Sequence, residues 1–116
     1  MTRAALLLAA LLAAAAAPAQ AADGARTYKL QCGTCHSPKS SAMAPSLAGV
    51  AGRKIAALSD FNYSKGLKAK AGTWTDANLD AYLAAPTKFA PGTRMMVGIA
   101  NSADRAAVIG YLKGMK

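Results

Sequence analysis

The chain's two cysteines and its only histidine lie within five consecutive residues, Cys32-Gly33-Thr34-Cys35-His36. Two thiols three positions apart at the end of a helix can each form a thioether to one vinyl group of a haem, and the adjacent imidazole is then held under the iron. A covalent haem would dictate most of the fold, because the chain has to wrap around a bulky group. The motif therefore predicts a c-type haem attached to Cys32 and Cys35, with His36 beneath it.

Three other interpretations of the motif are open. A structural zinc site normally takes four Cys or His ligands, and this sequence offers three. A thioredoxin-like redox disulfide lies in a βαβ context, and the sequence shows no strands of alternating polarity. A plain disulfide suits an oxidising compartment but gives His36 no role. Haem attachment is favoured because it uses all three side chains.

The N-terminal segment has the pattern of a secretory signal peptide. The basic start Thr2-Arg3 precedes an apolar run over residues 4–17, which is followed by Pro18 and the triplet Ala19-Gln20-Ala21. An uncleaved membrane anchor is the alternative, but it needs about 18 or more apolar residues. We therefore predict a leader over residues 1–21 that is cleaved near Ala21, one mature domain over residues 22–116, and export to the periplasm.

The mature domain is strongly basic. Once Arg3 is lost with the leader, thirteen Lys and Arg residues stand against five Asp and Glu, a formal charge of +8. The positive residues are dispersed, and both this and export argue against nucleic acid as the partner. The charge can simply keep the protein soluble. The other interpretation, which we prefer, is that it faces acidic protein surfaces.

Helix signals divide the mature chain into four helical segments. Asp23 is expected to cap a first helix that runs towards Cys32, and Ser64 a short helix over residues 65–70. Thr75 offers a cap to a third, in which apolar residues recur at helical spacing until Pro86 ends the pattern. A fourth begins near Ser102. Residues 37–60 and 87–100 are predicted to be loops around a bulky group.

A haem iron with histidine on one face needs a ligand on the other, and the thioether of methionine is a recurrent choice. The candidates after the leader are Met43, Met95, Met96 and Met115. A methionine usually fills gaps in a core. Met95 is preferred because it follows Pro91-Gly92-Thr93-Arg94, a stiff turn that can hold one side chain without a helix, and Met96 is the alternative.

The chain resembles class I c-type cytochromes, in particular the soluble bacterial members related to mitochondrial cytochrome c. The resemblance covers almost the whole mature chain and rests on motifs in the family's order: Cys32 to His36, Gly52-Arg53-Lys54, Phe61-Asn62-Tyr63-Ser64, Gly72-Thr73-Trp74-Thr75, Leu79 to Leu83 and Pro91 to Met95. It implies a small all-α fold with about four to five short helices and long loops around one covalent haem c.

The resemblance also implies roles for individual residues. His36 would be the proximal ligand and Met95 the distal one. The carbonyl of Pro45 would accept a hydrogen bond from the proximal imidazole. The remaining roles are Tyr63 and Trp74 as donors to a buried haem propionate, Arg53 as the cation that offsets its charge, Tyr82 beside the methionine ligand, and Thr93 near the inner propionate.

Two further positions bear on the fold. Gly24 and Tyr28 match residues that pack against Val108 and Tyr111, where a glycine lets two helices cross closely. Ala44 departs from the family, because many relatives have glycine before the proline that corresponds to Pro45.

If both axial positions are filled, no coordination site remains for a substrate, so the resemblance implies an electron carrier and not an enzyme. The expected partners of the monomer are acidic-surfaced redox proteins: a cytochrome bc-type complex, a terminal oxidase, a photosynthetic reaction centre or a dehydrogenase. Neither nucleic acid nor stable membrane insertion is expected. The cations that the resemblance places around the exposed haem edge are Arg26, Lys39, Lys88 and Arg94.

Two other classes of protein stay open at this point. A haem enzyme or gas sensor would have a vacant or labile sixth ligand position. A periplasmic thiol-disulfide protein would have Cys32 and Cys35 free or linked to each other.

Overall fold

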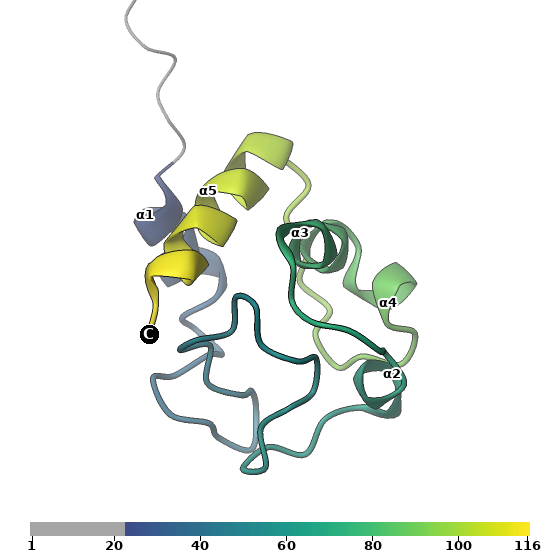
Figure 1. The fold of residues 1–116 in the computed structure, drawn as a ribbon. Helices are drawn as coiled ribbons and strands as arrows, with labels where there is room; N and C mark the ends of the chain where they lie inside the picture. The colour runs from purple at the N-terminus through teal and green to yellow at the C-terminus, as the bar shows by residue number, and fades with distance from the viewer. Residues whose placement is uncertain (1–22) are drawn as a thin grey trace, which may run out of the picture.

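The computed structural model describes residues 23–116 and contains five α-helices there (Figure 1). They are α1 (Gly24–Gln31), α2 (Lys65–Lys68), α3 (Asp76–Ala84), α4 (Pro86–Phe89) and α5 (Ser102–Gly114). Over the described part of the chain, β-pairing is limited to one isolated bridge, between Lys54 and Thr73. The predicted all-α fold of short helices and long loops is therefore confirmed. The predicted leader, residues 1–21, lies outside the described residues.

The predicted N-caps of α1, α2 and α3 are confirmed. A side-chain oxygen at each cap accepts a hydrogen bond from a free amide of the first turn: Asp23 from Arg26 (3.1 Å), Ser64 from Leu67 (3.3 Å) and Thr75 from Asn78 (3.1 Å). Helix α5 begins at Ser102 as predicted, and its cap is Asn101, whose side chain accepts from the amide of Asp104 at 3.0 Å.

Helix α4 was not predicted from the sequence. Pro86 does follow the end of α3 at Ala84, but it also opens a new one-turn helix, so the predicted loop over residues 87–100 is wrong at its start. The reason is that proline is tolerated at the first position of a helix, where its missing N–H would have no partner and its fixed φ is already helical. Helix α2 is also shorter than predicted and ends at Lys68.

The two ends of the domain meet where α1 lies beside α5 (Figure 1). A Cβ atom at Gly24 would lie 2.2 Å from the carbonyl oxygen of Ala107 and 3.3 Å from the Cβ of Tyr111. The rings of Tyr28 and Tyr111 pack with their centroids 5.0 Å apart. The predicted crossing is therefore present, with Ala107 as the backbone nearest to Gly24.

The apolar core joins α5 to α3, which also contacts α4. Half of its buried residues come from these two longer helices: Leu79, Tyr82, Leu83, Val108, Ile109 and Leu112. No helix within residues 23–116 has both the length and the apolar character to span a membrane.

The close helix crossing makes Gly24→Ala a test of the fold. The added Cβ would force α1 away from α5, and overpacking of this kind costs about 1–3 kcal/mol of unfolding free energy. Gly110→Ala is the matched control, because a Cβ at this α5 position meets nothing within 4 Å. The control should be neutral or more stable by about 0.5–1 kcal/mol through helix propensity. Denaturation of both holoproteins measures the difference, and a Gly24→Ala protein as stable as the wild type would contradict the crossing.

Candidate functional site

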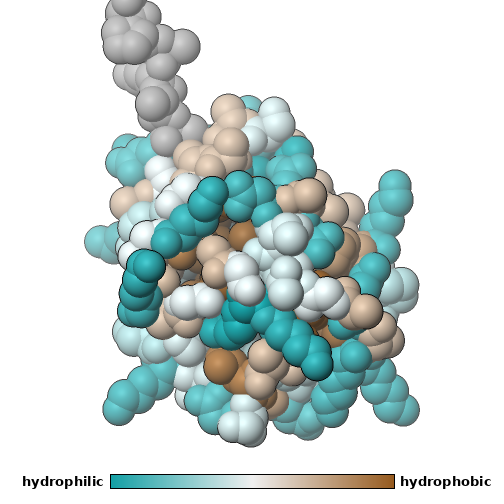
Figure 2. All heavy atoms as spheres, viewed as in Figure 1, coloured by the Kyte–Doolittle hydropathy of each residue, from teal (hydrophilic) through white to brown (hydrophobic). Residues whose placement is uncertain are grey.

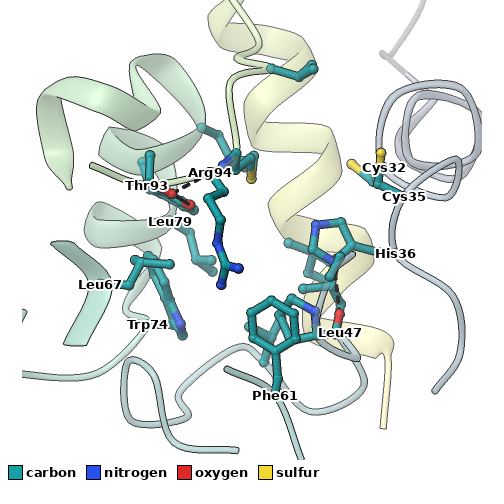
Figure 3. Close-up of a pocket in the computed structure, with 18 of the residues that line it drawn as sticks. Cys32, Cys35, His36, Leu47, Phe61, Leu67, Trp74, Leu79, Thr93 and Arg94 are labelled. Carbon is teal, nitrogen blue, oxygen red and sulfur yellow. Dashed lines mark hydrogen bonds between the residues drawn. The ribbon is translucent and has the colours of Figure 1, made fainter. Parts of the chain in front are cut away.

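A cavity of about 350 Å³ lies inside the ring of helices and loops (Figure 3). This volume is in the range of small-molecule and cofactor sites, and most of the lining is apolar. All ten residues predicted to contact a haem line the cavity: Cys32, Cys35, His36, Pro45, Arg53, Tyr63, Trp74, Tyr82, Thr93 and Met95. Residues from the start, middle and end of the mature chain are thus brought to one site.

The cysteine–histidine motif follows α1 as a tight turn. The amides of Cys35 and His36 both donate to the carbonyl of Cys32, at 3.1 and 2.9 Å. Figure 3 shows the two sulfurs and the imidazole on the same side of the cavity. Cys32 is buried and Cys35 exposed, and neither forms a disulfide. The turn therefore presents two free thiols and an imidazole together, as thioether attachment of a haem requires.

The imidazole of His36 is held in one orientation. Its Nδ1 donates to the carbonyl of Pro45 at 2.9 Å, so Nδ1 carries the proton and the lone pair of Nε2 is free. Burial lowers the pKa of His36 by more than the hydrogen bond to Pro45 raises it. The ring is therefore neutral, the form that ligates a metal, and its orientation is set by the partner of the other nitrogen.

Two serines fix the loop that carries Pro45. The amide of Ser46 donates to Oγ of Ser40 at 2.9 Å, and Oγ of Ser46 donates to the carbonyl of Pro38 at 2.8 Å. Ala44, where relatives often have glycine, is buried and does not have a positive φ, so the backbone accommodates the alanine. Both serine bonds are made by Ser46, so they hold the acceptor carbonyl of Pro45 from its C-terminal side.

Hydrogen-bond donors without acceptors mark another part of the cavity wall. Arg53 donates from Nη1 and Nη2 to the carbonyls of Ala48 and Ser46, each at 3.1 Å. Its Nε is buried and has no partner among the described residues. The hydroxyl of Tyr63 accepts from the amide of Leu58 at 3.3 Å, which leaves its own proton free. A buried donor without an acceptor lowers the stability of the fold. A carboxylate such as a haem propionate would accept from both Nε of Arg53 and the hydroxyl of Tyr63.

In the loop between α4 and α5, Thr93 organises the backbone around Met95. Its Oγ1 lies 2.7 Å from the hydroxyl of Tyr82 and accepts from the amide of Met95 at 3.3 Å. Burial raises the pKa of Tyr82 by more than the bond to Thr93 lowers it, so the phenol stays protonated. Met95 is half-buried, whereas Met96 is 73% exposed. Burial therefore favours Met95 over Met96 as the side chain that reaches a group in the cavity.

The chain matches the family model for cytochrome c over residues 21–116. The chain belongs to the cytochrome c family. It is 46% identical to cytochrome c2 iso-2 of Magnetospirillum fulvum over 88 residues, which cover 72% of this chain and 91% of that protein. It is 41% identical to cytochrome c of Tetrahymena pyriformis over 97 residues, or 82% of this chain and 88% of that one.

A longer relative and a solved structure agree with this assignment. The match to the cytochrome c-type cyt cy of Rhodobacter capsulatus is 42% identical and covers 77% of this chain but only 46% of that protein, so the chain spans about half of its length. The structure of cytochrome cH from Methylobacterium extorquens superposes with a TM-score of 0.73 at 35% identity and covers 80% of this chain and 96% of that one. The predicted family and fold are confirmed.

Membership implies haem c as the cofactor, and the residues of this cytochrome c fit it. The donors without acceptors suit a propionate, and the turn at Cys32 suits covalent attachment. Among residues 23–116 no three His, Cys, Asp or Glu side chains gather as a metal site, so a structural zinc is not supported. Burial raises the pKa of Cys32, whereas redox-active cysteines have a lowered pKa. The family assignment, together with this raised pKa, disfavours the thiol-disulfide interpretation.

The sequence did not single out Ser40 and Ser46. Serine is common in loops, and its hydrogen bonds to nearby backbone groups leave no specific spacing to recognise. Their effect on the orientation of His36 appears only when the loop is folded.

This serine arrangement predicts a change in the cytochrome's reduction potential. In Ser46→Ala the loop loses the bond from the hydroxyl to the carbonyl of Pro38 and the bond that the hydroxyl accepts from the amide of Ala48, at about 1 kcal/mol of stability each. If His36 ligates the haem iron, a looser carbonyl at Pro45 would polarise the imidazole less, the imidazole would be a weaker donor to oxidised iron, and the potential should rise. Ser41→Ala is the control, because Oγ of Ser41 accepts only from the amide of Met43, at 3.2 Å, and the bond from the Ser41 amide to the carbonyl of Ala44 does not depend on the side chain. Redox titration compares the variants, and equal potentials in all three proteins would refute the expectation.

Proposed function

We propose that this cytochrome c is a soluble electron carrier with one haem c, joined by thioethers to Cys32 and Cys35 and ligated by His36 and Met95. The observation that carries the proposal is the convergence of both cysteines, the oriented imidazole of His36 and the half-buried Met95 on a single cavity. The bound haem supplies one-electron oxidation and reduction of iron. The chain supplies the ligands, their orientation and the exclusion of water.

Each part of the cavity wall has a task in this proposal. His36 offers the lone pair of Nε2 on its neutral ring. The thioether of Met95 favours the reduced iron and so raises the potential. Arg53, Tyr63 and Trp74 stabilise a buried propionate, whose charge would otherwise be expensive in an apolar interior. Buried apolar side chains form part of the remaining wall: Val50, Leu79, Leu83, Val108 and Leu112.

Electron transfer is favoured over catalysis or gas sensing, because those functions need an open or labile distal position. The loop that carries Met95 is attached to Tyr82 of α3 through Thr93, two residues before the ligand, and Thr93 also bonds the amide of Met95. This attachment supports a filled distal position. No second function is supported by a comparable observation.

The proposed location is the periplasm, after removal of residues 1–21. There the protein would act as a monomer with acidic redox proteins as its partners. Neither nucleic acid binding nor membrane insertion is part of the proposal. The formal charge of +8 after loss of the leader supports such partners. Figure 2 shows long hydrophilic side chains around one face, with small areas of apolar surface between them. Arg94 lines the cavity itself, and Arg26, Lys39 and Lys88 are proposed to lie around the haem edge. The partner remains one of the four classes named above.

Spectra of two methionine variants test the ligation. The oxidised wild type should be low-spin with a methionine-to-iron charge-transfer band. This band should vanish in Met95→Ala and persist in Met96→Ala, because Met96 is exposed and Met95 is not. Reduced wild type should not bind carbon monoxide readily, whereas reduced Met95→Ala should. Loss of the band in Met96→Ala alone would reassign the ligand, and ready binding of carbon monoxide by the wild type would move the enzyme or sensor function to the front.

The basic charge predicts a steep effect of salt on electron exchange. The second-order rate constant with an acidic redox protein should fall about tenfold or more between low and physiological ionic strength, because the attraction that steers the two proteins together is screened. A small uncharged reductant is the control and should react at a nearly constant rate. Stopped-flow kinetics measure both, and a rate independent of salt with the acidic protein would contradict the proposed docking.

A further inference from the structure

The loop between α4 and α5, residues 90–101, carries the proposed distal ligand and is held on both sides of it. Before Met95, the attachment is the bond between Thr93 and Tyr82. Directly after Met95, the side chains of Met96 and Val97 are exposed, and so is Gly98. Among the described residues, the first hydrogen bonds on the C-terminal side of Met95 are those of Ile99.

Ile99 lies against the end of α3. Its side chain is buried, and its amide donates to the carbonyl of Leu83 at 2.7 Å. The preceding Gly98 passes so close that a Cβ there would lie 3.1 Å from the same carbonyl oxygen and 3.3 Å from that of Ala84. The loop thus occupies the C-terminal end of α3, where helix carbonyls lack partners within the helix.

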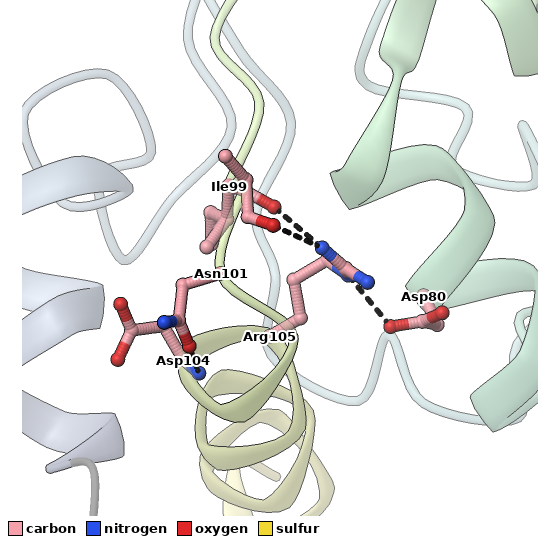
Figure 4. Close-up of polar contacts among 6 residues, drawn as sticks. Asp80, Ile99, Asn101, Asp104 and Arg105 are labelled. Carbon is pink, nitrogen blue, oxygen red and sulfur yellow. Dashed lines mark hydrogen bonds and ion pairs between the residues drawn. The ribbon is translucent and has the colours of Figure 1, made fainter.

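Arg105 of α5 joins this part of the loop to α3 (Figure 4). Its Nη1 donates to the carbonyls of Ile99 and Ala100, both at 2.9 Å, and its Nε donates to Oδ1 of Asp80 at 2.8 Å. The side chain of Arg105 is only 14% exposed. One guanidinium therefore connects three segments through charge-assisted hydrogen bonds, which are stronger than neutral ones.

A second ion pair between the same two helices provides a comparison. Lys113 of α5 and Asp76 of α3 lie 3.0 Å apart, but their side chains are 55% and 64% exposed. Lys113 makes no hydrogen bond to the loop. The two ion pairs join the same helices, and only that of Arg105 reaches the segment that carries Met95.

We propose that Arg105 is a positioning residue for Met95. By holding the carbonyls of Ile99 and Ala100 against Asp80, it fixes the C-terminal end of the ligand loop and opposes departure of the methionine sulfur from the iron. This inference rests on the proposed function, because it takes Met95 as the distal ligand. Loss of Arg105 frees that end of the loop, so the loop opens more often while the rest of the fold stays closed.

Binding of free imidazole to the oxidised holoprotein tests the proposal. Imidazole reaches the iron only when Met95 has left, so its apparent affinity reports the fraction of protein with an open loop. Arg105→Gln should tighten imidazole binding about tenfold or more, because two charge-assisted bonds to the loop are lost. Lys113→Gln, the matched control, should change it less than about twofold, since an exposed pair contributes little.

Two further variants separate positioning from general stability. Arg105→Lys keeps a positive charge but loses the planar fork that reaches both carbonyls, so it should also tighten imidazole binding. Asp80→Asn keeps Arg105 and weakens its attachment to α3, which should give a smaller change in the same direction and serves if Arg105→Gln does not fold. Denaturation of every variant gives the global stability against which the imidazole affinities are compared.

The outcomes distinguish this inference from the function on which it rests. Equal imidazole affinities in Arg105→Gln and Lys113→Gln, or affinities that merely follow global stability, would overturn the positioning role while the methionine charge-transfer band still supports Met95 as ligand. Absence of that band in the wild type would instead overturn the ligation, and the positioning role with it.

Discussion

The apolar core of the domain is built around the central cavity. The buried core side chains of α3 and α5, with the exception of Ile109, also line the cavity. A domain this small buries a limited core, and here much of that core faces the space for the cofactor. Haem in this position would complete the core, so binding of the cofactor and stability of the fold would be coupled.

A core of this kind leaves the ligand loops with little helix packing to hold them, and side-chain hydrogen bonds to the backbone take over that role. The loop after His36 is held by Ser40, Ser46 and Arg53, which bond backbone groups around Pro45. The loop around Met95 is held by Thr93 on one side and by Arg105 on the other. Both proposed ligands are thus fixed by polar contacts to flanking backbone rather than by the element that carries them.

The sequence predicted most of the fold and ten of the residues that line the cavity, for different reasons. Three of the helix caps could be read directly, because a cap is a local pattern. The prediction of the site depended on the cysteine–histidine motif and on the family resemblance. The ten residues that these two named all line the cavity. The preference for Met95 over Met96 came from a turn, and burial of the folded loop now supports it independently.

What the sequence could not predict consists of contacts that exist only after folding. Helix α4 was missed because Pro86 was read as the end of one helix and not also as the start of the next. Ser40 and Ser46 were missed because serine is unremarkable in a loop. Arg105 carries no local signal at all, since its partners lie on α3 and on residues 99–100 and are brought together by the packing of α5.

Arg53 links the two halves of the site. It holds the carbonyl of Ser46, next to the Pro45 carbonyl that orients His36, while its free Nε suits a negative group in the cavity. A propionate that binds Nε would shift the guanidinium and so change the hydrogen bond between Nη2 of Arg53 and the carbonyl of Ser46. The charge state of such a propionate would therefore be coupled, through one side chain, to the hydrogen bond between Pro45 and His36. A rigid guanidinium fork suits this position because it bonds several groups at once in a fixed geometry.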